Sequence, residues 1–285
     1  MATFEYVEPG TLEDAFDALE RGGDDAHLLA GGTALVLLVR LGLVLPGHVI
    51  SLRRIQGLRE IGISKEGGLE IGALVTHAEI ERSALVQRFF APLAQTFGHV
   101  ATVRIRNQAT IGGNLVHADP ASDPPPMLIA MDAEIVVARR GGVRTIAAAD
   151  FFRDIFEVAL EPGEIVTSVR IPPPRGMRGT YVKFLPASKD DFATVSVAAT
   201  LQLAANGDCA DVRLALGSVA TTPVRARRAE EALRGKRITR ETIETAAAIV
   251  AEEVDPLDDV RGSAGYKREM ARVWTRRALA QLVPA

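Results

Sequence analysis

The chain has 285 residues, of which 47% are hydrophobic and 24% are charged, and its formal net charge is −3. This composition is typical of a globular protein with ample apolar material for a core, and it favours neither nucleic acid nor an anionic membrane as the main partner. Cys209 is the only cysteine, which excludes an internal disulfide, a cysteine-ligated iron–sulfur cluster and a zinc site held by several thiolates.

The N-terminal part of the chain predicts alternating strands and helices. Residues 11–23 have apolar positions at helical spacing, between Thr11 as N-cap and a Gly-Gly stop. A short apolar strand at 28–30 is followed by the Gly31-Gly32 turn and a helix, and "HVISL" has the pattern of another strand. We therefore expect a small parallel sheet in this region.

The longest apolar run extends from Ala34 to Pro46 and is interrupted by Arg40. It is too short to span a bilayer, so we predict a helix buried in the protein and no integral membrane segment. The first residues, "MATFEYVEPG", lack the charged start and apolar run of a signal peptide. Together with the single cysteine, this predicts a cytoplasmic protein.

The middle of the chain predicts shorter and more antiparallel strands. A strand at 68–73 precedes a short helix that Thr76 could cap, and residues 89–101 predict a second helix. Residues 132–152 have the pattern of a strand, a Gly-Gly turn and another strand, and residues 163–174 that of a strand ended by prolines. This pattern favours a second subdomain.

The C-terminal part predicts a third sheet with helices on it. Strands are expected at 181–186 and 195–203, and "ANGD" at 205–208 is a hairpin turn signal. Residues 239–254 and 263–283 predict amphipathic helices.

Two glycine pairs, Gly31-Gly32 and Gly112-Gly113, are the first candidates for a binding site. Each provides backbone that a ligand can approach closely, and each is followed by a polar residue, Thr33 or Asn114. Free N–H groups at such turns suit a phosphate, although a Gly-Gly pair is more often a structural turn. The Rossmann glycine fingerprint and the P-loop are both absent. The two pairs together predict one shared diphosphate ligand held by a different fold.

The acids after the second glycine pair leave several roles open. Asp119 and Asp123 could hold a metal if His117 folded back toward them, but no further ligand stands at a suitable spacing. Both acids could instead cap turns next to prolines. We favour Asp123 as a hydrogen-bonding acid facing ribose hydroxyls or amide nitrogens, and we predict no metal site. No histidine stands in a nucleophile motif, so we predict no catalytic side chain.

Four segments carry a resemblance to the FAD-binding medium subunits of the molybdenum hydroxylases, the family of xanthine dehydrogenase and aerobic carbon monoxide dehydrogenase. They are "LLAGGTAL" at 28–35, "VRIRNQATIGGNLVHADPASDPPPMLIAMDAEI" at 103–135, "LEPGEIVTSVRIP" at 160–172, and "YVKF" to "DFATVSVAA" at 181–199. The C-terminal "SAGYKREMARVWTRRAL" also resembles this family. The match runs in order along nearly the whole chain.

The resemblance implies an α+β protein with the vanillyl-alcohol-oxidase-type (PCMH-like) FAD-binding fold. Residues 1–56 would be the N-terminal FAD-binding subdomain, 57–175 the middle FAD-binding subdomain and 176–285 a C-terminal flavoprotein domain of a sheet with helices. It also implies a set of FAD-contacting residues from both glycine turns and three later positions. These are Leu29, Ala30, Gly31, Gly32, Thr33, Ala34, Leu35, Thr110, Ile111, Gly112, Gly113, Asn114, Asp123, Val166 and Lys183.

The resemblance implies an electron-transfer subunit of an oxidoreductase. A large partner subunit would carry the molybdenum cofactor and a small partner subunit would carry [2Fe–2S] clusters, in a dimer of heterotrimers. The flavin of this chain would pass electrons to an external acceptor, and the loop at 185–195, with Lys189, would lie beside the flavin ring. The alternatives are a self-sufficient flavin oxidoreductase of the same fold and a nucleotide-binding scaffold protein. The substrate and the acceptor remain open.

Overall fold

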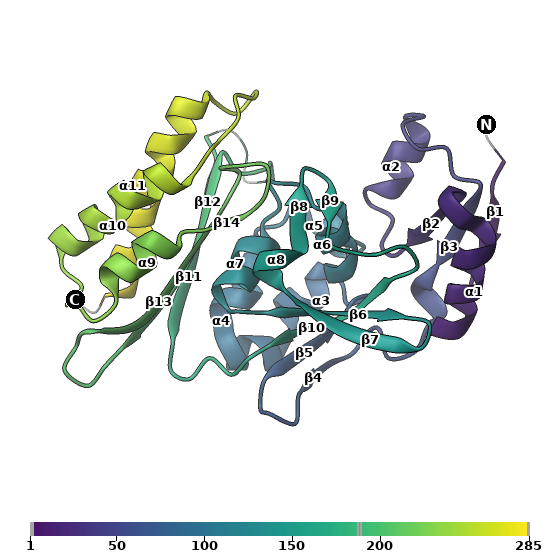
Figure 1. Ribbon diagram of the computed structural model, residues 1–285, viewed down its shortest axis with the longest axis horizontal. Helices are drawn as coiled ribbons and strands as arrows, with labels where there is room; N and C mark the ends of the chain where they lie inside the picture. Colours follow the sequence, from purple (N-terminus) through teal and green to yellow (C-terminus); the bar gives the residue numbers. More distant parts are fainter. Residues whose placement is uncertain (1–2, 187, 189, 284–285) are drawn as a thin grey trace.

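The computed structural model describes residues 3–186, 188 and 190–283. Three sheets follow one another along the long axis of the molecule, with the N-terminus at one end and the C-terminus at the other (Figure 1). This arrangement confirms the predicted α+β architecture and the predicted C-terminal sheet covered by helices. Within the described residues, every helix is too short or too polar to cross a bilayer.

The N-terminal sheet has three parallel strands in the order β1-β3-β2. Helix α1 (Leu12–Gly22) packs on it, and the hydroxyl of Thr11 accepts a hydrogen bond from the N–H of Asp14, as expected for an N-cap. The predicted alternation of strands and helices and the predicted parallel sheet are therefore confirmed. The strands are β1 (Glu5–Val7), β2 (Ala26–Leu29) and β3 (His48–Ser51).

The helix predicted to be buried after Ala34 is instead partly exposed. Helix α2 (Leu35–Arg40) has only six residues, none of them buried, and it stands away from the body of the protein (Figure 1). In the segment after it, Leu41 is 63% exposed, Leu43 70% and Leu45 69%. The prediction was wrong because an apolar composition favours burial without specifying which surface covers the side chains.

The middle sheet has five antiparallel strands in the order β4-β5-β10-β6-β7. Helix α3 (His77–Arg82) begins with the predicted Thr76 cap, in which Thr76 and Glu79 bond to each other's backbone N–H groups. Helix α4 (Ala84–Gly98) follows it directly. The strands are β4 (Ile61–Ile63), β5 (Leu69–Gly72), β6 (Glu134–Arg139), β7 (Gly142–Ala147) and β10 (Ile165–Ile171).

Three short helices of the middle subdomain were not predicted as helices. They are α5 (Val103–Arg106), α6 (Ile111–His117) and α7 (Pro124–Ala130). Every residue of α7 is buried, and its prolines stand in the first turn, where a missing N–H costs nothing. After α8 (Ala148–Phe151), strands β8 (Phe152–Asp154) and β9 (Glu157–Val158) form a small hairpin.

The C-terminal sheet is antiparallel, in the order β11-β12-β13-β14. The predicted hairpin turn at 205–208 joins its two longest strands. The helices cover one face, and α7 and α4 of the middle subdomain contact the sheet from the other side (Figure 1). The strands are β11 (Arg178–Phe184), β12 (Val195–Leu203), β13 (Cys209–Gly217) and β14 (Val224–Arg225), and the helices are α9 (Arg227–Leu233), α10 (Arg240–Glu253) and α11 (Ala264–Leu282).

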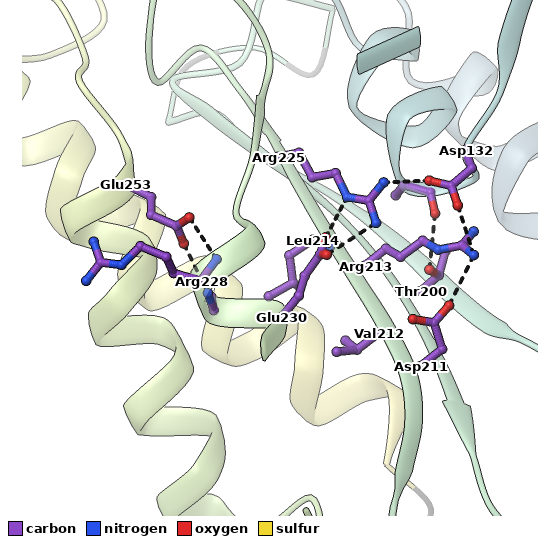
Figure 2. Close-up of polar contacts among 12 residues, drawn as sticks. Asp132, Thr200, Asp211, Val212, Arg213, Leu214, Arg225, Arg228, Glu230 and Glu253 are labelled. Carbon is purple, nitrogen blue, oxygen red and sulfur yellow. Dashed lines mark hydrogen bonds and ion pairs between the residues drawn. The ribbon is translucent and has the colours of Figure 1, made fainter. Parts of the chain in front are cut away.

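An ion-pair network fastens this sheet to the middle subdomain (Figure 2). Asp132, at the end of α7, pairs with Arg213 of β13 and with Arg225 of β14. Arg225 also pairs with the buried carboxylate of Glu230, which accepts a hydrogen bond from the N–H of Leu214. Because Asp132 pairs with arginines on two strands of the C-terminal sheet, this network orients the two parts of the chain.

Candidate functional site

The first glycine turn presents backbone donors that the chain itself does not use. Five residues separate the end of β2 at Leu29 from the start of α2 at Leu35. Gly32 has a φ of +75°, a conformation that favours glycine. In the described part of the chain, the N–H groups of Gly31 to Ala34 have no hydrogen-bond partner. Four unpaired N–H groups at a turn before a helix are suited to bind an anion.

The two glycine turns lie against each other. A Cβ added at Gly31 would be 2.0 Å from the carbonyl oxygen of Gln108, and one added at Gly113 would be 3.5 Å from the Cβ of Ala30. Gly31 is thus required because two backbones touch at this point. The two turns therefore lie close together through direct packing within the protein, and the shared diphosphate stays a prediction.

The second glycine pair belongs to the first turn of helix α6, whose N–H groups are already bonded within the chain. Thr110 is its N-cap and accepts a hydrogen bond from the N–H of Gly113 through its hydroxyl. A ligand contact from this helix would therefore use the side chains of Thr110 and Asn114. The other bonded donors are the N–H of Ile111 to Val75, of Gly112 to Ala73 and of Asn114 to the carbonyl of Thr110.

The side chain of His77 hydrogen-bonds to the backbone at Thr110. Its side chain is fully buried, and Nε2 lies 3.3 Å from the carbonyl oxygen of Thr110, a distance at which the ring donates to that carbonyl. The edge of the ring also contacts Phe97. Burial lowers the pKa of His77 from 6.5 to about 4, so the imidazole is neutral at physiological pH.

We expect this buried histidine to make the protein sensitive to acid. Since the pKa is lower in the folded chain, its contribution is complete above the unfolded pKa of 6.5 and is lost as the pH falls toward about 4. The loss of unfolding free energy between pH 7 and about pH 4.5 should be about 2–3 kcal/mol smaller in His77→Phe than in the wild type. Urea unfolding at both pH values measures this difference, and equal losses would contradict it.

Asp123 and Lys183 meet in a buried cluster with Tyr181. The Lys183 ammonium lies 2.9 Å from Oδ2 of Asp123, and the Tyr181 hydroxyl donates to Oδ1 over 2.6 Å. The two charged side chains are only 2% and 4% exposed. Lys183 also donates to the carbonyl oxygen of His99. The Asp123 carboxylate, predicted to face a ligand, therefore has both oxygens bonded to protein donors.

Burial determines the protonation behaviour of this cluster. It raises the pKa of Asp123, against the opposing influence of the Lys183 ammonium and the two hydrogen bonds. Burial and the neighbouring carboxylate raise the pKa of Tyr181 well above its usual value, so the phenol remains a donor. Tyr181 was not predicted as a site residue. The alternation in "YVK" was the available signal, because residues two apart on β11 share a face.

The remaining predicted residues have varied surroundings. Val166, on β10, is buried in the core of the middle subdomain, which also contains Ile111 and Leu115 of α6. Leu29 and Leu35, at the two ends of the first turn, are half-buried. Lys189, predicted to lie beside the flavin ring, is outside the described residues. Among the described residues, no three potential ligands of the His, Cys, Asp and Glu types are grouped to hold a metal.

Comparison with known proteins identifies the family to which this arrangement belongs. Residues 2–174 match the family described as the FAD binding domain in molybdopterin dehydrogenase, and residues 180–282 match the CO dehydrogenase flavoprotein C-terminal domain. The chain belongs to this family of FAD-binding medium subunits. It is therefore an oxidoreductase subunit with FAD as its cofactor.

Two relatives match this chain over nearly their whole length. The chain is 32% identical to the glyceraldehyde dehydrogenase medium chain of Sulfolobus acidocaldarius, over 98% of each chain. It is 34% identical to the carbon monoxide dehydrogenase medium chain of Hydrogenophaga pseudoflava, over 97% of this chain and 96% of the relative.

Solved structures of the family have the same fold. A chain of the Hydrogenophaga pseudoflava carbon monoxide dehydrogenase, solved without the Mo-pyranopterin moiety of its cofactor, superposes with a TM-score of 0.94 at 35% identity, over 98% of this chain and 96% of that one. A chain of the quinoline 2-oxidoreductase of Pseudomonas putida 86 gives 0.92 at 33% identity, over 98% and 96%. The predicted fold of an FAD-binding medium subunit is thus confirmed.

The residues present fit an FAD-binding medium subunit. The unpaired N–H groups of Gly31 to Ala34 can receive the diphosphate, and no side chain stands on the turn at Gly31 or Gly32 to block its approach. The buried Lys183 ammonium pairs with Asp123, whose other carboxylate oxygen accepts a hydrogen bond from the Tyr181 hydroxyl.

Proposed function

We propose that this chain is the flavoprotein component of a molybdenum-containing hydroxylase or dehydrogenase complex. It takes electrons from [2Fe–2S] clusters on a partner and passes them to an external acceptor. The observation that carries the proposal is the set of unpaired N–H groups at Gly31 to Ala34, packed against the α6 segment that ends near Asp123. A diphosphate needs several donors at close range, and this turn supplies them.

Each part of the proposed FAD site has a defined task. The first turn, Leu29 to Leu35, binds the diphosphate through its N–H groups. Residues Thr110 to Asn114 line the opposite side of the diphosphate. Asp123 and Lys183 border the ligand as a buried ion pair, and Val166 contributes an apolar wall. When bound, FAD supplies the electron-transfer chemistry. The chain binds and orients the cofactor, and we assign no catalytic side chain.

The proposed partners follow from the family and from the single cysteine. The relatives include chains named as medium chains and as a dehydrogenase complex subunit. We propose a large partner subunit with the molybdenum cofactor and a small one with the [2Fe–2S] clusters, in a dimer of heterotrimers in the cytoplasm. Cys209 is buried and alone, so cysteine-ligated clusters must be on another chain.

The proposal predicts noncovalently bound flavin. Cys209 lies on β13, far along the chain from both glycine turns, and the only histidine close after a turn, His117, packs its ring against Phe156. The purified chain should be yellow, and acid precipitation should release the flavin into the supernatant. A colourless chain would contradict FAD binding, and colour that stays with the pellet would contradict the noncovalent attachment.

A further inference from the structure

The N–H groups of the second glycine turn, residues 111–114, are all bonded within the chain. A donor that this turn offers to a ligand must therefore come from a side chain. Asn114 is only half-buried and lies beside the first turn, because a Cβ added at the preceding Gly113 would be 3.5 Å from the Cβ of Ala30. An amide side chain has two N–H donors and one carbonyl acceptor. The orientation of the amide thus decides whether Asn114 attracts or repels an anion.

A serine eight positions later determines the orientation of this amide. The hydroxyl of Ser122 donates to Oδ1 of Asn114 over 2.9 Å. The amide oxygen is therefore directed toward the protein, and the NH2 group of Asn114 has no hydrogen-bond partner among the described residues. This NH2 group is not enclosed by the protein, so both of its N–H donors are available to a ligand.

The protein holds Ser122 itself in place from both sides. Ser122 is only 4% exposed, and its N–H donates to the carbonyl oxygen of Asp119. The next residue is Asp123, whose carboxylate is bonded to Lys183 and Tyr181. A hydroxyl that is fixed by its surroundings can hold its own hydrogen-bond partner in one orientation.

We infer that Ser122 is a positioning residue for the diphosphate of FAD. It orients Asn114 so that the second glycine turn donates side-chain N–H groups to the same diphosphate that the N–H groups of Gly31 to Ala34 receive. This inference rests on the proposed function, because that function supplies the anion. An amide of the opposite orientation would direct its carbonyl oxygen at the phosphate oxygens and would repel them.

The first test is a double-mutant cycle of Ser122→Ala and Asn114→Ala, with FAD affinity measured by titration of the FAD-free chain. Ser122→Ala should weaken FAD binding about five- to tenfold, and Asn114→Ala at least about tenfold. In the Asn114→Ala background, Ser122→Ala should have no further effect, because the amide that it orients is absent. A hydroxyl that only stabilises the fold would weaken FAD binding equally in both backgrounds, and this result would overturn the inference.

Ser218→Ala is the matched control for the loss of a buried hydroxyl. The N–H of Ser218 donates to the carbonyl oxygen of Pro120, close to Ser122 in the chain. The hydroxyl of Ser218 is buried and has no hydrogen-bond partner among the described residues. Ser218→Ala should therefore bind FAD with wild-type affinity.

The second test changes the charge of the Asn114 side chain and keeps its shape. Asn114→Asp replaces the NH2 group with a carboxylate oxygen, while Ser122 can still donate to the other oxygen. We expect at least about a 100-fold loss of FAD affinity, because a negative charge then faces the diphosphate. Urea unfolding of the FAD-free variant should show a folded chain, which separates this loss from unfolding.

A loss of less than about threefold in Asn114→Asp would overturn the inference, because the amide would then not face the anion. Failure of the proposed function is visible separately, since the wild-type chain would then bind no FAD.

Discussion

Replacing Gly31 with valine is expected to abolish FAD binding. A Cβ at this position would be 2.0 Å from the carbonyl oxygen of Gln108 and 2.8 Å from its carbonyl carbon, so the first turn must move away from the second. The displaced segment carries the unpaired N–H groups of Gly31 to Ala34. We expect at least about a 100-fold loss of FAD affinity, equivalent to about 2.7 kcal/mol, measured by flavin absorbance and by titration of the FAD-free chain.

The controls separate this clash from a general effect of removing glycine. Gly10 also precedes a helix, and a Cβ there would meet no atom within 4 Å, so Gly10→Val should retain full flavin content. Gly32→Ala should have an intermediate effect. Its added Cβ would meet only the side-chain ends of Leu29 and Val36, but its φ of +75° costs a residue with a Cβ about 1–2 kcal/mol. Full flavin content in Gly31→Val would contradict the proposed role of the contact between the turns.

Replacing Asp123 with alanine is expected to destabilise the fold itself. The substitution leaves the Lys183 ammonium, which is only 2% exposed, without its counter-ion, and it removes the acceptor of the Tyr181 hydroxyl. An unpaired buried charge costs about 3–5 kcal/mol. Urea unfolding of the FAD-free chain measures this cost without the added stability that bound ligand provides.

Two further variants test whether the lost unfolding free energy comes from the buried charge. Adding Lys183→Met to Asp123→Ala removes that charge and should restore part of the unfolding free energy. Tyr181→Phe leaves the ion pair intact and should cost only about 1–3 kcal/mol. Surface substitutions typically change the unfolding free energy by no more than about 0.5 kcal/mol. If Asp123→Ala changes it by no more than this, the carboxylate does not balance the charge of Lys183.

Local sequence determined much of the fold. Thr11 and Thr76 were predicted as N-caps because capping depends on residues within one helical turn, and both accept the expected hydrogen bonds. The strand and turn signals at 132–152 and 205–208 gave the two hairpins for the same reason. The short helices α5, α6 and α7 were missed because helices of so few residues depend on tertiary packing for their stability.

The resemblance located the site, but it did not reveal how the site residues interact. It placed Asp123 and Lys183 near the cofactor, 60 positions apart in the sequence. Only the structure pairs them with each other and adds Tyr181. An ion pair across such a separation depends on how β11 packs against the start of α7, and no local pattern encodes that packing.

By itself, the sequence determined the family, the alternation of strands and helices, and the two glycine turns. The tertiary structure decided what those glycines and apolar residues do. Gly31 is required by the backbone of Gln108, and the leucines after α2 remain exposed where burial was expected. Both outcomes have one physical reason. Steric contact and burial depend on which surfaces meet in the folded chain. The residue type specifies only how much free energy such a contact costs or gains.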